Sequence, residues 1–235
     1  RVVILATGDP LWFSVGARIA SAIPREEIVF HPQLSAFQLA AARMRWSLAD
    51  VETLTVHGRP IEQAIPFFAP GTRLLILTQG PETPHGIAAL LTEHGYGPSP
   101  MSVLAAMGGP EEARIDGTAA SWSAEAPALH VLAVECQAAP GARVLPRGPG
   151  LPDDAFEHDG KMTKRVVRAA TVAALAPRPG QVMWDLGAGS GSVAIEWLRA
   201  TQNAQGKGAT AIAIERDADR VGMIARNAAA LGTPF

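Results

Sequence analysis

A glycine-rich turn is the segment of the chain best suited to binding a ligand. Residues 182–197 read VMWDLGAGSGSVAIEW, in which an apolar strand-like run ends at Asp185 and is followed by Gly187, Gly189 and Gly191. Glycines let the chain turn sharply and let a ligand approach the backbone where a Cβ would block it. The next strand-like run ends at Glu215, whose carboxylate can accept two hydrogen bonds at once.

The spacing of these glycines argues against a dinucleotide-binding fold. Such folds carry G-x-G-x-x-G with an acid about 20 residues further on, whereas here the third glycine comes one residue early and the next strand-end acid is Glu215. The pattern instead resembles motif I of class I S-adenosylmethionine methyltransferases. That resemblance implies that Asp185 and the glycines contact the cofactor and that Glu215 accepts the ribose hydroxyls. A structural strand–turn–helix with incidental glycines is the alternative.

Three basic residues lie close together in the sequence before this turn. Lys164, Arg165 and Arg168 lie within one turn of a helix predicted from about Thr163, which can cap it, to Leu175. The plain interpretation is a solvated helix face, and the functional one is a surface for a polyanionic substrate. His158, beside Asp159, could titrate or donate a hydrogen bond to a substrate carboxylate.

A second candidate turn lies near the start of the chain. The run RVVILAT predicts a strand at Val2–Ala6, and it ends in Gly8, Asp9 and Pro10 before a helix. Ligands bind at the carboxyl edge of open α/β sheets, where such a turn would lie. Alone the signal is weak, because these residue types are common in turns.

The order of elements predicts an α/β fold. In residues 1–140, apolar runs alternate with Ala-rich stretches, which indicates a largely parallel sheet flanked by helices. Residues 141–160 are rich in proline and glycine and predict a linker. Residues 161–235 predict the first half of a doubly wound domain. The predicted strands are Val2–Ala6, Ile28–Phe30, Leu74–Leu77, Val131–Val134, Val182–Leu186 and Ala211–Glu215, and the predicted helices of the first domain are Leu34–Met44 and Ile87–His94.

Composition narrows the function classes. The net charge of −2 lacks the basic excess that drives nucleic-acid binding, and no apolar run is long enough to span a membrane. The histidines lack the spacing of a metal site, and the single cysteine, Cys136, is expected to be buried. We therefore expect a globular cytoplasmic protein with no nucleic-acid or membrane partner and no metal.

Three ordered segments resemble the tetrapyrrole methylase family: ATGDPLWFSVG, HPQLSAFQLAAARMRW and LTQGPETPHGIAALLTEHGYG. The segment GLPDDAFEHDGKMTKRVVRAATVAALAPRPGQVMWDLGAGSGSVAIEW resembles the joining segment and second domain of the fused, decarboxylating C5,15-methyltransferases of precorrin-6Y. Together these resemblances cover nearly the whole chain. They imply a tetrapyrrole-methylase-like domain followed by part of a Rossmann-like class I methyltransferase domain.

The resemblance also implies an activity. The first domain would methylate carbon 5 of a corrin precursor, and the second would methylate carbon 15 and remove an acetate carboxyl, both with S-adenosylmethionine. A cofactor pocket in the first domain would have Gly8, Asp9 and Pro10 at its floor and the loop near Thr78 to Gly80 on its wall. The substrate's carboxylates would be held by Lys164, Arg165, Arg168 and His158. A homo-oligomer is expected.

The chain departs from the family in three places. The family's glycine-rich first strand is absent, the second domain ends after two strands, and Lys161 stands where the family has glutamine. We therefore expect a fragment truncated at both ends, which could be inactive. A class I methyltransferase acting on RNA or protein and a non-catalytic scaffold are the alternative functions.

Overall fold

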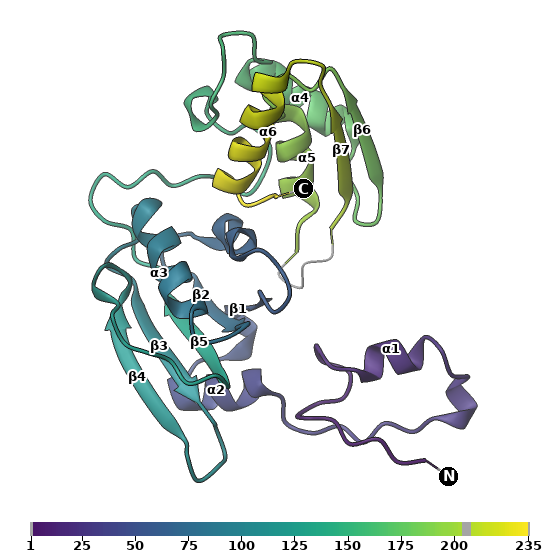
Figure 1. Cartoon of the computed structure of the whole chain (residues 1–235), viewed down its shortest axis with the longest axis vertical. Helices are drawn as coiled ribbons and strands as arrows, with labels where there is room; N and C mark the ends of the chain where they lie inside the picture. Colours follow the sequence, from purple (N-terminus) through teal and green to yellow (C-terminus); the bar gives the residue numbers. More distant parts are fainter. Residues whose placement is uncertain (1, 204–207, 235) are drawn as a thin grey trace.

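The computed structural model describes residues 2–203 and 208–234 and places them in two units, each built on its own sheet (Figure 1). The first unit has a five-stranded sheet of order β1-β2-β5-β3-β4. Its strands are β1 (Val51–Thr55), β2 (Arg73–Leu77), β3 (Pro100–Ala105), β4 (Ala113–Thr118) and β5 (His130–Glu135). Its helices are α1 (Gly16–Ala20), α2 (Ala36–Met44) and α3 (Thr83–Glu93), with short 3-10 turns at Arg25–Glu27, Leu48–Asp50, Ile61–Phe67 and Ala119–Ser121.

Alternation along the central strands gives this sheet two buried faces. Leu74 and Ile76 of β2 pack with the core that includes Ile87 and Leu91 of α3, whereas Leu75 between them packs with Phe37 of α2. Successive strand residues point to opposite faces, so an unbroken apolar run is what a strand covered on both sides needs. The prediction of an α/β fold is confirmed, and Cys136 is buried in the α3-side core, as expected.

The prediction of a largely parallel sheet in the first domain is wrong. Among the described strands of the first unit, β1 and β2 alone pair in parallel, and the β2–β5, β3–β5 and β3–β4 pairs are antiparallel. The sequence ARIDGT of β4 lacks an apolar pattern, and none of its residues is fully buried, so no local pattern predicts the hairpin that β4 forms with β3.

The predicted strands Val2–Ala6 and Ile28–Phe30 are also wrong. Both segments are irregular, and the side chains of Val2 and Leu5 are 86% and 92% exposed. A strand needs a neighbour for its backbone N–H and C=O groups, whereas the N-terminal segment that carries α1 lies away from the five-stranded sheet (Figure 1). An apolar run alone therefore does not predict pairing.

The second unit has the alternating strand–helix order of the first half of a doubly wound domain, as predicted. Strands β6 (Val182–Leu186) and β7 (Thr210–Ile214) pair in parallel, joined by α5 (Ser192–Thr201) and followed by α6 (Ala218–Ala230). Helix α4 (Arg165–Leu175) precedes β6, and its N-cap is Lys164, so the prediction that Thr163 caps it is wrong. The helices lie on one side of the strand pair (Figure 1), and the other side exposes Val182, Trp184, Leu186, Ile212 and Ile214.

A buried ion pair ties the irregular segment before α4 to this unit. Arg168 on α4 is fully buried; its Nε donates to Oε1 of Glu196 on α5 at 2.7 Å, and its guanidinium also bonds Asp153 and the carbonyls of Leu151 and Thr163. The two Glu196 oxygens accept the N–H groups of Gly150 and Leu151 at 2.7 and 2.8 Å. Each buried charge is thus compensated by partners on other elements.

The side chains of Leu151, Phe156 and Met162 in this irregular segment are consequently part of the second unit's core. Leu151 and Phe156 are buried with Ile195 of α5 and Leu231 after α6, and the Arg168 guanidinium lies 4.7 Å from the Phe156 ring centroid. The predicted linker over 141–160 includes a 3-10 turn at Asp153–Ala155. Over residues 2–203 and 208–234, no helix combines the length and apolarity needed to cross a membrane.

Removing the buried guanidinium should destabilise the second unit strongly. We expect Arg168→Ala to lower the free energy of unfolding by about 3–5 kcal/mol, because it leaves the Glu196 carboxylate buried without its partner. The matched control is Arg143→Ala, which breaks the exposed pair with Asp154 and should cost no more than about 1 kcal/mol. Urea denaturation followed by far-ultraviolet circular dichroism measures both, and equal losses would contradict this account.

Candidate functional site

The glycine turn joins β6 to α5 and is fixed by the end of β7. The N–H groups of Gly187 and Ala188 both donate to the Ile214 carbonyl, at 2.8 and 3.1 Å, and the Gly191 N–H donates to the Ala188 carbonyl. Gly187, Gly189 and Gly191 have φ of 79°, 58° and 76°, a region that L side chains rarely adopt. The backbone of the turn therefore explains why glycine stands at all three positions.

Two of these glycines also leave space above the backbone. A Cβ built on Gly187 or Gly189 meets no described atom within 4 Å, whereas one on Gly191 would lie 3.0 Å from Cγ2 of Ile224 on α6. The first two glycines thus present bare backbone to the surroundings, and the third is packed against a helix. A ligand that approaches the turn would meet peptide groups at Gly187 and Gly189 without a side chain in the way.

Two carboxylates stand at the carboxyl ends of β6 and β7, beside the turn. Burial raises the pKa of Asp185, against a hydrogen bond from the Ala194 N–H, and among the described residues its Oδ2 has no hydrogen-bond partner. The Glu215 carboxylate accepts the N–H groups of Gly189, Arg216 and Asp217. The bonds from Asp217 and Gly189 are the main causes that lower the pKa of Glu215.

The charged residues predicted around the substrate separate into two groups. Arg168 does not belong to an exposed cationic face: it is fully buried, and its guanidinium makes four hydrogen bonds to protein groups. We therefore withdraw it as a substrate ligand. Lys164 and Arg165 are exposed at the start of α4, and Nε of Arg165 donates to the Gly150 carbonyl. His158 is half-buried, and its Nδ1 accepts the Gly160 N–H at 3.0 Å.

The Gly8–Pro10 turn is tightly built. Gly8 has φ of 68°, the Asp9 carboxylate accepts the Leu11 N–H at 2.8 Å, and a Cβ on Gly16 would lie 2.1 Å from the Pro10 carbonyl oxygen. The turn therefore requires glycine at residue 16, where α1 begins against it. The ring centroids of Phe13 and Phe37 lie 5.7 Å apart, and this contact attaches the segment to α2.

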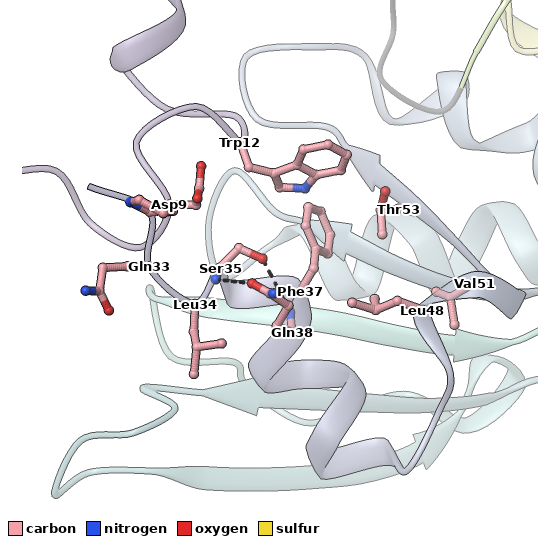
Figure 2. Close-up of a pocket in the computed structure, with 11 residues that line it drawn as sticks. Asp9, Trp12, Gln33, Leu34, Ser35, Phe37, Gln38, Leu48, Val51 and Thr53 are labelled. Atoms are coloured by element: carbon pink, nitrogen blue, oxygen red, sulfur yellow. Dashed lines mark hydrogen bonds between the residues drawn. The ribbon is translucent and has the colours of Figure 1, made fainter. Parts of the chain in front are cut away.

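A cavity of about 700 Å³ opens between this turn and α2 (Figure 2). Asp9 and Trp12 line it from the N-terminal segment, Phe37 lines it from α2 and Thr53 from β1. Ser35 and Gln38, which also line it, form a capping box at the start of α2, with Ser35 N–H donating to Gln38 Oε1 at 2.7 Å. Sequence reasoning missed this wall, although the S-x-x-Q pattern is the known signature of such a box.

The structure does not bring Thr78 to this cavity. Thr78 follows β2, where its hydroxyl donates to the His130 carbonyl at 3.1 Å, and it is not among the residues that line the cavity. The prediction placed Gly8–Pro10 at the carboxyl edge of the sheet, beside Thr78. Because the N-terminal segment does not join the sheet as a strand, the two segments do not share a site here.

Comparisons with known proteins agree with both resemblances found in the sequence. Residues 154–235 match the model of a precorrin methyltransferase domain. Two similar curated proteins are the precorrin-6Y C(5,15)-methyltransferases [decarboxylating] of a Sinorhizobium species, 44% identical over 99% of this chain, and of Mycobacterium tuberculosis (strain CDC 1551 / Oshkosh), 42% identical over 97%. The chain spans 55% and 56% of the lengths of these two relatives.

One solved structure and one further family model complete the comparison. The C-terminal domain of precorrin-6Y C5,15-methyltransferase from Rhodobacter capsulatus is 49% identical, with 36% of this chain and 42% of that chain covered and a TM-score of 0.32. Residues 1–122 match the model of the tetrapyrrole (corrin/porphyrin) methylases, which is more than half of the 235 residues. The chain therefore belongs to the tetrapyrrole (corrin/porphyrin) methylase family.

Proposed function

We propose that this chain carries out methyl transfer from S-adenosylmethionine to a corrin precursor, as part of an enzyme that methylates carbons 5 and 15 and decarboxylates one acetate side chain. The observation that carries the proposal is the glycine turn, with bare backbone at Gly187 and Gly189 between two strand-end carboxylates. The names of the relatives, which match nearly the whole chain, support the reaction and the substrate.

The residues at the turn fit this cofactor. Glu215 uses three N–H donors, and since a carboxylate offers about four lone-pair directions, it can accept a ribose hydroxyl while keeping its present bonds. Asp185 has an acceptor oxygen that no described residue uses. The cofactor supplies an electrophilic sulfonium methyl group. Gly187 and Gly189 let the ligand lie against the backbone, and the turn's bonds to Ile214 hold that surface in place.

The proposed chemistry needs alignment more than a reactive side chain. A macrocycle carbon supplies the electron pair of each new carbon–carbon bond, and sulfur keeps the pair of the bond that breaks. Decarboxylation releases carbon dioxide, and a proton takes the place of the lost carboxylate. The protein's task is to orient the two reactants and exclude water. This agrees with the lack of a Ser-His-Asp or Cys-His pattern in the sequence.

Lys164, Arg165 and His158 are the proposed ligands of the substrate carboxylates in the second unit. Lys164 and Arg165 are exposed, and all three belong to the segment that the Arg168–Glu196 pair holds on α5. A macrocycle with many acetate and propionate groups needs such cationic partners, and guanidinium groups bind carboxylates bidentately.

We propose a second cofactor site in the first unit, at the cavity beside Gly8, Asp9 and Pro10. Its volume of about 700 Å³ lies in the range of small-molecule sites. Trp12 and Phe37 supply apolar surface for a base, and Asp9, Gln33 and Gln38 supply polar groups. The division into domains at 1–140 and 161–235 and a homo-oligomeric assembly also stay predictions.

Calorimetric titration with S-adenosylhomocysteine tests the proposed function. We expect two binding events for each chain, one at the glycine turn and one at the Asp9 cavity. If only one binding event is seen and Trp12→Ala leaves its affinity unchanged, the proposed site in the first unit is wrong. No binding by a chain shown to be folded would contradict the methyltransferase function and favour a scaffold.

Gly189→Val should abolish or greatly weaken the event at the turn, because its side chain would fill the space that the ligand needs. Gly180→Val is a matched control: Gly180 also has a positive φ, 82°, and also meets no described atom within 4 Å, but it lies at the opposite end of β6. Both variants should lose about 1–3 kcal/mol of stability from backbone strain. If the two variants bound S-adenosylhomocysteine equally well, the turn would not be the cofactor site.

Charge reversal at the start of α4 tests the substrate surface. Lys164→Glu should weaken binding of a porphyrin octacarboxylate by about tenfold, the effect of one charge-assisted hydrogen bond, and should leave S-adenosylhomocysteine affinity unchanged. Arg178→Glu, an exposed reversal beyond the other end of α4, is the control and should have little effect. Absorbance titration measures both affinities. Equal weakening by the two variants would indicate a non-specific charge effect and no site at Lys164.

A further inference from the structure

A buried amide on α6 joins two segments that the proposed site needs. Asn227 is 3% exposed, and its Nδ2 donates both hydrogens, one to the Glu157 carbonyl and one to the Ser190 carbonyl, each at 2.9 Å. Its Oδ1 accepts the Glu157 N–H at 2.7 Å. The side chain therefore pairs with both backbone groups of Glu157 and with the glycine turn at the same time.

The two segments joined in this way carry the two halves of the proposed site. Ser190 lies between Gly189 and Gly191 in the turn, and Glu157 directly precedes His158 in the segment that leads to Lys164. Two exposed ion pairs, Glu157–Arg226 and Asp159–Arg220, also attach this segment to α6. Exposed pairs contribute little, because water competes with them, whereas the Asn227 amide is buried.

We propose that Asn227 is a positioning residue that clamps residues 157–163 against the glycine turn, so that cofactor and substrate groups meet at a fixed separation. The inference rests on the proposed function of that turn. An amide suits this task because two carbonyl oxygens and one N–H must be satisfied at once, which requires two donors and an acceptor on one side chain. A carboxylate of the same shape has no donor for either carbonyl.

Asn227→Asp turns this requirement into a pH-dependent test. Above the pKa of the new carboxyl group, its negative charge faces two carbonyl oxygens, and the clamp opens. Below that pKa the protonated acid can donate to one carbonyl and accept the Glu157 N–H. Burial disfavours the charged form of the new carboxyl group and raises its pKa, so ligand binding should recover at an experimentally accessible pH. The side chain of Asn227→Ala has no donor and no acceptor, so binding by this variant should not recover at low pH.

The measurement is the dissociation constant of S-adenosylhomocysteine at the glycine turn, from about pH 8 to about pH 5. Asn227→Asp should bind at least about tenfold more weakly than the parent at the upper pH and approach the parent at the lower pH. Taking the ratio to the parent at each pH removes the titration of shared groups, which are His158, Glu157, Asp159, Asp185 and Glu215 with the partners Arg220 and Arg226. Arg226→Gln breaks only the exposed ion pair with Glu157, so its dissociation constant should stay within about twofold of the parent's.

Thermal unfolding at each pH shows that the variants are folded. Amide hydrogen exchange tests, without a ligand, whether Asn227 holds residues 157–163 against the turn. Exchange in Asn227→Ala should rise in residues 157–163 and in residues 187–191 together, and not in β1–β5. Should that variant not fold, the parent is sufficient, because saturating S-adenosylhomocysteine should slow exchange in 157–163 as well as at the turn.

The outcomes separate this inference from the proposed function. A parent that does not bind S-adenosylhomocysteine overturns the proposed function and the positioning role with it, whatever the exchange shows. A parent that binds, with Asn227→Asp binding equally well at every pH, overturns the positioning role alone. Weaker binding by Asn227→Asp without recovery at low pH also counts against it, because general destabilisation would then explain the loss.

Discussion

The Arg168–Glu196 pair is the interaction on which the second unit depends. Both side chains are buried, and such charges are tolerated only when all sides are hydrogen-bonded. Backbone groups of the irregular segment supply these hydrogen bonds. The N–H groups of Gly150 and Leu151 donate to Glu196, and the carbonyls of Leu151 and Thr163 accept from Arg168. A proline- and glycine-rich stretch whose one regular element is the 3-10 turn at Asp153–Ala155 thereby gains a fixed course over α5.

This fixed course determines what surrounds the glycine turn. Because Thr163 is held by Arg168, the exposed Lys164 and Arg165 begin α4 at a defined place, and Asn227 holds the backbone next to His158 against Ser190. The turn is itself determined by three positive φ angles and by the Ile214 carbonyl. Hydrogen bonds to neighbouring elements therefore hold both the glycine turn and the segment before α4 in place.

The parts of the site that could be predicted from the sequence are those fixed by local rules. Glycine spacing after an apolar run predicts a turn with positive φ, so Gly187, Gly189 and Gly191 follow from short-range chemistry, and the helix that joins the two apolar runs predicts the parallel β6–β7 pair. The burial of Arg168 could not be predicted from the sequence, because the partners of its side chain are distant in sequence. Val166 is 80% exposed while Arg168, two residues on, is fully buried, because its guanidinium pairs with Glu196 and Asp153, distant in sequence, and with two backbone carbonyls. No helical pattern would place arginine inside and valine outside.

In the first unit, too, local patterns predict some features, whereas others depend on contacts between distant residues. Strands β2 and β5 could be predicted from their apolar runs, because burial on both faces needs such runs, whereas β1, β3 and β4 and the pairing partners could not. Val2–Ala6 has the composition of a strand and no neighbour in the sheet, so the Gly8–Pro10 turn lies by α2 and not beside Thr78. Strand direction and register depend on contacts between distant residues, which a single sequence does not display.

The central claim is that the bare backbone between Asp185 and Glu215 is a cofactor surface. A crystal structure of the chain with S-adenosylhomocysteine tests it most directly. The account predicts ligand density over Gly187 and Gly189, with a ribose hydroxyl hydrogen-bonded to the Glu215 carboxylate. Density confined to other surfaces, with nothing over Gly187 and Gly189, would contradict it.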